Sequence, residues 1–291
     1  MLPGEILEMI NTNINLFKTC KRYYFHKSIF YKEFIADVQD LRYHMEPTEI
    51  KHHILRYNTP HWLLDYIHNN TFKIMNYNQS VIHFSNLTYL SFDPNFNEPL
   101  GKLPNTLTYL ILGNKFNQIV ALPDYLIELT IGDKFDQPLK LPMTLKQLTI
   151  GDKFDRPLDL PPTLKYLTLG TYYNQILQLP ELESLILGYC YNQPLELPAT
   201  LKYLTLGMLF DQPLILPNNL KSLILGEAFN QTLVLPDSLK IVTFGDSFNQ
   251  IFNFPTKLKY IKLTKYYNNL IDIDSIPKNV EFYIGDMLIN Y

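Results

Sequence analysis

The chain has 291 residues, of which 46% are hydrophobic and 18% charged, and its formal net charge is −3 at pH 7. Because its lysines and arginines are scattered and the net charge is negative, the composition argues against a nucleic-acid partner. Cys20 and Cys190 lie far apart and favour a reducing compartment, while the lack of a leader-like start and of a long apolar run favours an intracellular protein with no membrane segment.

The first 35 residues contain two short apolar sets at helical spacing. The first is Leu2-Pro3-Gly4-Glu5-Ile6-Leu7, and the second is Thr19-Cys20-Lys21-Arg22-Tyr23-Tyr24. These sets resemble the opening and the close of an F-box, with a shorter stretch between them than is usual. The resemblance implies docking onto a Skp1-like adaptor through five residues: Leu2, Pro3, Ile6, Leu7 and Cys20. The alternative is an amphipathic helical cap over the first coil of the array that follows.

Residues 36–70 are expected to form a helical linker or N-terminal cap. Ile50, Ile54 and Leu55 have helical spacing, and Pro47 and Pro60 are expected breaks. Five of the seven histidines fall in this segment, but neither a cysteine nor a ligand spacing supports a metal site. We therefore expect no metal.

From about residue 71 to residue 291 the chain repeats one unit. Its clearest markers are glycines at steps of 19 residues, with a single step of 18; they stand at positions 113, 132, 151, 170, 188, 207, 226 and 245. A unit this short cannot bury its apolar side alone, so the period predicts stacked coils. In Leu-x-x-Leu-x-Leu-Gly the last two leucines alternate with an outward residue, as in a short strand. We predict a mainly β repeat solenoid: about ten 19-residue, leucine-rich-repeat-like coils with parallel strands and a small N-terminal helical cap.

Two further columns follow each glycine. An aromatic residue and then Asn or Asp recur ten times, from Phe96-Asn97 to Tyr267-Asn268. The aromatic rings are expected to stack inside the solenoid as a spine. Since both Asn and Asp occupy the second column, we expect these side chains to accept hydrogen bonds from backbone N–H groups in a tight turn and to stay partly hydrated.

The unit resembles the FNIP repeat, a relative of the leucine-rich repeat named for its Phe-Asn-x-Pro core. Phe96-Asn97-Glu98-Pro99 matches that core, and Phe135-Asp136-Gln137-Pro138 is a close variant. The period of 19 residues is shorter than the roughly 22 usual for that repeat. An F-box-like start followed by FNIP repeats is typical of amoebae and of the giant DNA viruses that infect them, which implies a location in the (host) cytoplasm.

The outward strand positions are the expected site of function, because tyrosines supply rigid, amphipathic contact area for protein partners. The candidate partner-binding residues are Tyr89, Tyr109, Thr130, Thr149, Tyr166, Thr168, Tyr203, Thr205, Thr243 and Tyr260. The alternative is that Thr and Tyr merely favour exposed strand positions.

The leading hypothesis is a non-enzymatic interaction protein that needs no cofactor, with the solenoid binding a protein target and the N-terminal segment docking onto an SCF-type ubiquitin ligase. Neither a Ser-His-Asp arrangement, nor a paired-carboxylate site, nor a phosphate-binding loop is present. The alternatives are a structural scaffold with no ubiquitin-ligase link and a glycan-binding solenoid.

Overall fold

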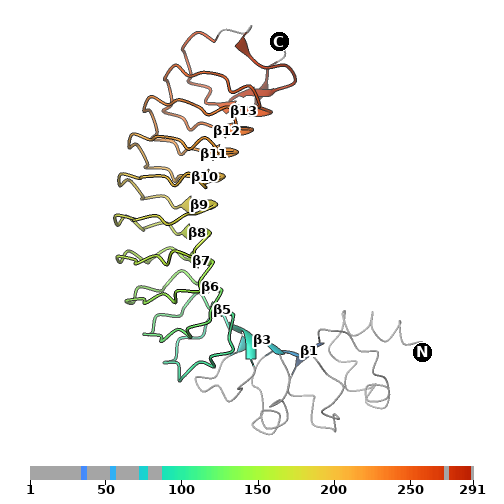
Figure 1. Ribbon diagram of the computed structural model, residues 1–291, viewed down its shortest axis with the longest axis vertical. Helices are drawn as coiled ribbons and strands as arrows, with labels where there is room; N and C mark the ends of the chain where they lie inside the picture. The colour runs from blue at the N-terminus through green and yellow to red at the C-terminus, as the bar shows by residue number, and fades with distance from the viewer. Residues whose placement is uncertain (1–33, 38–52, 57–71, 78–86, 272–274, 290–291) are drawn as a thin grey trace, which may run out of the picture.

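The computed structural model describes residues 34–37, 53–56, 72–77, 87–271 and 275–289. Each coil of the chain contributes one short strand to a single sheet, and the order of strands in the sheet is the order along the chain (Figure 1). The strands are β1 (Phe34–Asp37), β2 (His53–Arg56), β3 (Phe72–Tyr77), β4 (Leu87–Phe92), β5 (Tyr109–Leu112), β6 (Glu128–Ile131), β7 (Gln147–Ile150), β8 (Tyr166–Leu169), β9 (Ser184–Leu187), β10 (Tyr203–Thr205), β11 (Ser222–Ile224), β12 (Ile241–Thr243), β13 (Tyr260–Leu263), β14 (Glu281–Ile284) and β15 (Met287–Leu288).

The sheet is parallel from β1 to β14, and only β15 runs antiparallel to its neighbour. Equivalent leucines pair across neighbouring strands, as Leu148 does with Leu167 and Leu167 with Leu185. The shorter repeat before β9 therefore keeps the register, because the missing residue falls in the connecting segment. The prediction of a mainly β solenoid of about ten parallel-strand coils is confirmed.

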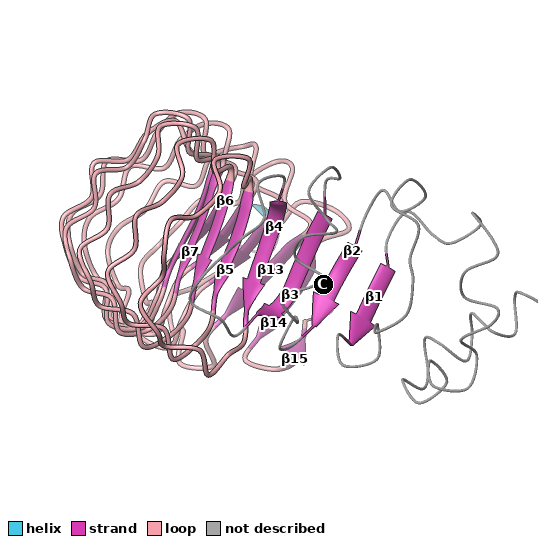
Figure 2. Ribbon diagram, turned by 90° about the horizontal axis from the view of Figure 1, so that it is seen from below, coloured by secondary structure: helices cyan, strands magenta, loops and turns pink. Residues whose placement is uncertain are grey.

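The solenoid curves, and its strands line the concave side (Figure 1). Turns and extended segments form the rest of each coil, and they stack on the side away from the strands (Figure 2). Nineteen residues leave too little chain for a strand, its turns and a return helix. Among the described residues the return path contains no α-helix.

Alternation of buried and outward residues explains the strands from β5 to β13. In β7, Leu148 and Ile150 are buried while Gln147 and Thr149 lie outward, and β6 and β13 repeat the pattern. The buried leucines and isoleucines of successive coils merge into one continuous hydrophobic core. A single coil has no second layer of its own, so its strand is stabilised only when neighbouring coils complete this core.

The aromatic spine runs through that core. From Phe96 to Phe248, and on to Tyr267, the rings of neighbouring coils stack with centroids 5.9–6.3 Å apart and interplanar angles of 2–16°. Most of these rings are fully buried. The predicted spine is confirmed.

The Asn/Asp column forms a hydrogen-bonded ladder between coils. Asn192 Oδ1 accepts the backbone N–H of Asp211, the equivalent residue one coil later, at 3.0 Å, and the side-chain amide of Gln212 at 3.1 Å. Asp211 accepts in the same way from Asn230 and Gln231. Since only the acceptor oxygen is used, Asp can replace Asn, as predicted, but the donors belong to the next coil rather than to the tight turn that was expected. The column is half-buried to exposed, in agreement with the expected hydration.

The glycine column marks the closest approach of successive coils. A Cβ placed on Gly207 would lie 1.9 Å from the carbonyl oxygen of Gly188, and Gly188 stands in the same relation to Gly170. None of these glycines has a positive φ. The column is therefore glycine because the neighbouring backbone leaves no room for a side chain.

The C-terminal hairpin ends the described part of the sheet. Gly285 and Asp286 form a two-residue turn between β14 and β15, and Gly285 has φ +60°. A positive φ at the first turn residue alone matches a type II′ turn, whose twist suits antiparallel strands. The hairpin therefore gives the sheet an antiparallel last strand.

The N-terminal region differs from expectation where it is described. His53–Arg56 forms strand β2 in parallel pairing with β1, so the helix predicted through Ile54 and Leu55 is wrong for these four residues. Apolar residues at this spacing suit a short buried strand as well as a helix. Strand β1 (Phe34–Asp37) likewise lies where the helical segments 1–35 and 36–70 were expected to meet, so the sheet begins well before residue 71, where the repeat array was expected to start. The predicted helical cap otherwise lies outside the described residues.

Candidate functional site

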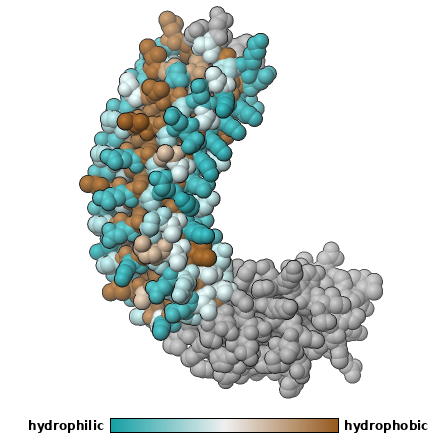
Figure 3. Space-filling view, viewed as in Figure 1, coloured by the Kyte–Doolittle hydropathy of each residue, from teal (hydrophilic) through white to brown (hydrophobic). Residues whose placement is uncertain are grey.

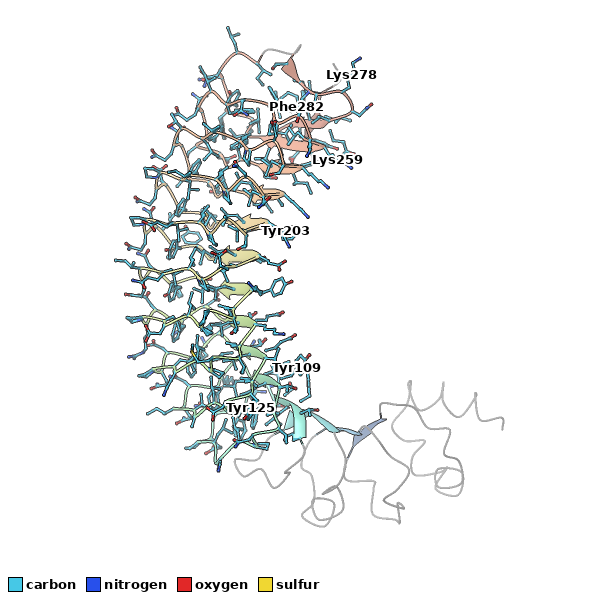
Figure 4. All side chains as sticks on the ribbon, viewed as in Figure 1. Tyr109, Tyr125, Tyr203, Lys259, Lys278 and Phe282 are labelled. Carbon is cyan, nitrogen blue, oxygen red and sulfur yellow. The ribbon has the colours of Figure 1, made fainter. Side chains whose placement is uncertain are left out.

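The candidate site is the concave face, which we define as the outward side chains of β4 to β14 together with the residue that precedes each strand from β6 to β13. Tyr109, Tyr203 and Lys259 project from this side of the solenoid (Figure 4). Figure 3 shows hydrophilic residues predominating along the concave edge. Because the strands are in register, each outward position becomes a continuous column that runs along the face.

All ten predicted partner-binding residues occupy outward positions of these strands. Tyr109, Tyr166 and Tyr203 are exposed, and the others are partly buried. The structure therefore brings the ten together in two columns of one face, as the repeat predicts. Their role in binding stays a prediction. The two columns hold, respectively, Tyr89, Tyr109, Tyr166, Tyr203 and Tyr260, and Thr130, Thr149, Thr168, Thr205 and Thr243.

The middle of the face, from β8 to β12, combines aromatic and aliphatic exposure. Tyr166 and Tyr203 are 45% and 48% exposed, and Ile186, Ile224 and Ile241 are 40–42% exposed. Exposed rings and branched side chains on a rigid sheet suit contact with a protein, because little conformational entropy is lost when they are covered. These isoleucines were absent from the predicted set, although they stand in the same two columns.

Lysines form a third column that the sequence reasoning missed. The residue directly before the first strand position is Lys in six of the seven coils between β7 and β13, and the seventh is Glu183. The column consists of Lys146, Lys165, Glu183, Lys202, Lys221, Lys240 and Lys259. These lysines could have been found in the sequence, because they recur with the same 19-residue period as the other columns.

The negative charge of Glu183 is stabilised by the neighbouring lysines. Its carboxylate lies 2.7 Å from Lys202 Nζ. The hydrogen bond and charge of Lys202, with smaller contributions from Lys165 and Lys221, hold the pKa of Glu183 below its ordinary value. This carboxylate is ionised at neutral pH and offsets part of the charge of the column.

The turn that follows the strands carries a second exposed group. Tyr172, Tyr189 and Leu209, from three successive coils, are 55%, 44% and 43% exposed. Their turns are joined by backbone hydrogen bonds, such as Leu209 N–H to Tyr189 C=O at 3.0 Å. They form an apolar rim at the C-terminal end of β8–β10, beside the most apolar part of the concave face.

Among the described residues, His, Cys, Asp and Glu form no group of three or more that could hold a metal ion. Cys190 is a free thiol, half-buried in the rim turn. No helix in the described part of the chain is long and apolar enough to cross a membrane.

The five candidate adaptor-binding residues lie outside the described residues. Leu2, Pro3, Ile6, Leu7 and Cys20 all precede β1, the first described strand.

Comparison with known proteins places the repeat in a family. The model of the FNIP repeat matches nine stretches, most of them overlapping, that together run from residue 77 to residue 283: 77–115, 116–153, 135–172, 154–190, 173–209, 191–228, 210–247, 229–255 and 248–283. A search of curated proteins finds no match.

The solved structures that match this chain include CroV588 and YopM. CroV588, described as a novel circular LRR protein, is 28% identical, with a TM-score of 0.62; the match covers 81% of this chain and 43% of CroV588. YopM from Yersinia enterocolitica WA-314 is 18% identical, with a TM-score of 0.49, and the match covers 83% of this chain and 66% of YopM. This chain thus spans less than half the length of CroV588. With its repeat matched over most of its length, the chain belongs to the FNIP-repeat family.

Proposed function

We propose that the chain is a non-enzymatic interaction protein whose concave face binds a protein partner. The observation that carries the proposal is the row of exposed tyrosines and isoleucines on β8–β12, centred on Tyr166 and Tyr203. These side chains stand on a sheet fixed by the aromatic spine and the Asn/Asp ladder, so the surface is already ordered before a partner arrives. The partner is expected in the cytoplasm of the host cell.

Site-specific photo-crosslinking tests this proposal. A benzophenone amino acid at position 203, on the concave face, is expected to capture a discrete partner from amoebal cytosol. The same group at position 215, where Ile215 is 90% exposed on the return segment, is the control. Tyr166→Ala with Tyr203→Ala should abolish partner recovery, whereas Tyr125→Ala, at an exposed tyrosine outside the strands, should not. Equal capture from both crosslinking positions would contradict the proposal.

The second part of the proposal is that the N-terminal segment binds an adaptor protein, and it rests on the F-box resemblance of residues 1–35. In it, Leu2, Pro3 and Ile6 contact a Skp1-type adaptor and thereby bring the partner to a ubiquitin ligase. Recovery of Skp1 with the full chain, lost in the triple variant Leu2→Ala, Pro3→Ala, Ile6→Ala, is the expected result. Absence of Skp1 at high bait concentration would leave the alternative of a scaffold, in which deleting residues 1–35 causes unfolding without loss of any partner.

A further inference from the structure

The lysine column described above, hereafter the lysine ladder, is fixed in geometry by the backbone. Lys221 N–H donates to Lys202 C=O at 2.8 Å, and Lys240 and Lys259 each donate to the preceding lysine at 2.9 Å. The hydrogen bonds hold successive backbone positions one strand spacing apart, about 4.8 Å. From Lys146 to Lys259 the ladder therefore covers about 29 Å of the concave face.

Most of the charge on the ladder is uncompensated. Lys202 pairs with Glu183, and Lys165 Nζ donates to the carbonyl oxygen of Glu181 at 2.9 Å. Lys146, Lys221, Lys240 and Lys259 are exposed and belong to none of the ion pairs found among the described residues. Lys262, two strand positions beyond Tyr260 on the same face, pairs with the highly exposed carboxylate of Asp286 at 2.9 Å.

The fold does not need lysine at these positions. Earlier coils place Thr108 and Ile127 in the same column, and their backbone groups make the same hydrogen bonds. Like charges directly opposite each other on neighbouring strands are destabilising, so a run of lysines costs folding stability that threonine would not. A bound anion that faces the ladder would remove this repulsion.

We propose that the lysine ladder binds an acidic, extended segment of a protein partner. The inference rests on the proposed function of the concave face as a protein-binding surface. An extended segment that follows the ladder would need about nine residues, at about 3.3 Å each, to span it. The tyrosine column runs directly beside the ladder and offers apolar contact to the side chains between the acidic ones.

A protein segment fits this surface better than a nucleic acid does. Lysine supplies point charges, whereas phosphate recognition favours the forked donors of arginine, and the ladder contains no arginine. Glu183 interrupts the ladder, and a peptide can place a neutral residue opposite it, whereas a nucleic acid carries a phosphate at every nucleotide.

Fluorescence anisotropy tests the proposal directly on the full chain. The probes are fluorescein-labelled 12-residue poly-glutamate, 12-residue poly-lysine and a 12-nucleotide oligo(dT). We expect poly-glutamate to bind at low ionic strength, with an affinity that falls as salt is added, and poly-lysine not to bind. Lys221→Glu with Lys240→Glu should weaken poly-glutamate binding about tenfold or more, since each reversal replaces an attraction by a repulsion.

The matched control is Lys134→Glu with Lys153→Glu, two exposed lysines in the turns after β6 and β7, which changes the net charge by the same amount. Binding by this control within about twofold of the parent chain supports the ladder as the site. Equal loss in both variants, no binding of poly-glutamate, or tighter binding of oligo(dT) would overturn the proposal. If crosslinking from position 203 survives such a failure, the protein-binding face stands and only the acidic nature of its ligand is rejected.

Discussion

Tyr173 and Tyr191 stack in neighbouring coils of the spine with ring centroids 6.3 Å apart and planes 4° apart, and the buried hydroxyl groups of both lack a hydrogen-bond partner. They flank the 18-residue repeat. Every other member of the spine from Phe96 to Phe248 is phenylalanine. The two hydroxyls are therefore polar groups whose desolvation is not compensated by any protein group around them.

Replacing these two tyrosines by phenylalanine should stabilise the protein. Tyr173→Phe with Tyr191→Phe removes two unpaired buried hydroxyls and is expected to raise the free energy of unfolding by about 1 kcal/mol or more for each. Tyr267→Phe is the control, because the Tyr267 hydroxyl donates to Gln250 C=O at 3.1 Å and its loss should destabilise. Urea unfolding followed by circular dichroism measures both; a lower midpoint for the double variant would contradict the prediction.

Alkaline pH should unfold the parent chain more readily than this double variant. Burial raises the pKa of Tyr173 and Tyr191 well above the ordinary value of 10. The unfolded chain releases these phenolic protons near pH 10 while the folded chain keeps them, so folding stability falls as the pH rises above 10. Thermal midpoints measured between pH 8 and pH 11 should decline more steeply for the parent than for the double variant. Parallel curves would show that Tyr173 and Tyr191 do not cause the loss of stability at alkaline pH.

Gly207→Ala should destabilise the solenoid strongly. The new Cβ would lie 1.9 Å from the carbonyl oxygen of Gly188, so two coils must separate locally and the strand pairing of β9 with β10 weakens. A cost of about 3 kcal/mol is expected, at the upper end of the range for overpacking. Gly101→Ala, at an exposed glycine of a return segment, should change the unfolding midpoint little. Similar midpoints for the two variants would show that the coils separate at little cost.

Asn249 should tolerate aspartate but not alanine. Its Oδ1 accepts the backbone N–H of Asn268 and the side-chain amide of Asn269, both at 3.1 Å. Its neighbours in the column, Asn230 and Asn268, carry no charge, so Asn249→Asp keeps the acceptor without repulsion. Asn249→Ala removes the acceptor of the Asn268 backbone N–H, while the amide of Asn269 keeps its hydrogen bond to the Asn249 carbonyl oxygen at 2.7 Å, and the change is expected to cost about 1 kcal/mol. Differential scanning calorimetry should rank parent and Asn249→Asp together, above Asn249→Ala; a low midpoint for the aspartate variant would mean that the amide donor matters.

The sequence was sufficient for the repeat, the strand positions, the spine and the acceptor role of the Asn/Asp column. Each follows from a residue type that recurs at one period, and stacking converts that recurrence into contact. The lysine ladder was not predicted from the sequence, because strict strand alternation would point the residue before each strand into the core. In the structure Lys146 N–H and Gln147 N–H both donate to Ile127 C=O, and this local bend turns two successive side chains outward.

The N-terminal strands were not predicted from the sequence, for a different reason. The spacing of Ile50, Ile54 and Leu55 suits a helix, and only pairing with β1 and β3 makes Ile54 and Leu55 part of a strand. Tertiary pairing of this kind leaves no local mark in a short apolar run. The apolar rim of Tyr172, Tyr189 and Leu209 was not predicted, because its members differ in residue type and occur in only three successive coils.

The spine also determines the curvature of the surface that a partner meets. Stacked rings repeat every 5.9–6.3 Å, whereas neighbouring strands repeat at about 4.8 Å. Successive coils are therefore further apart on the side of the rings than on the side of the strands. This difference in spacing bends the solenoid, with the strands on the inside of the arc. Replacing a ring by a smaller side chain would flatten the arc locally. The fit of a partner on the concave face thus depends on residues that it never touches.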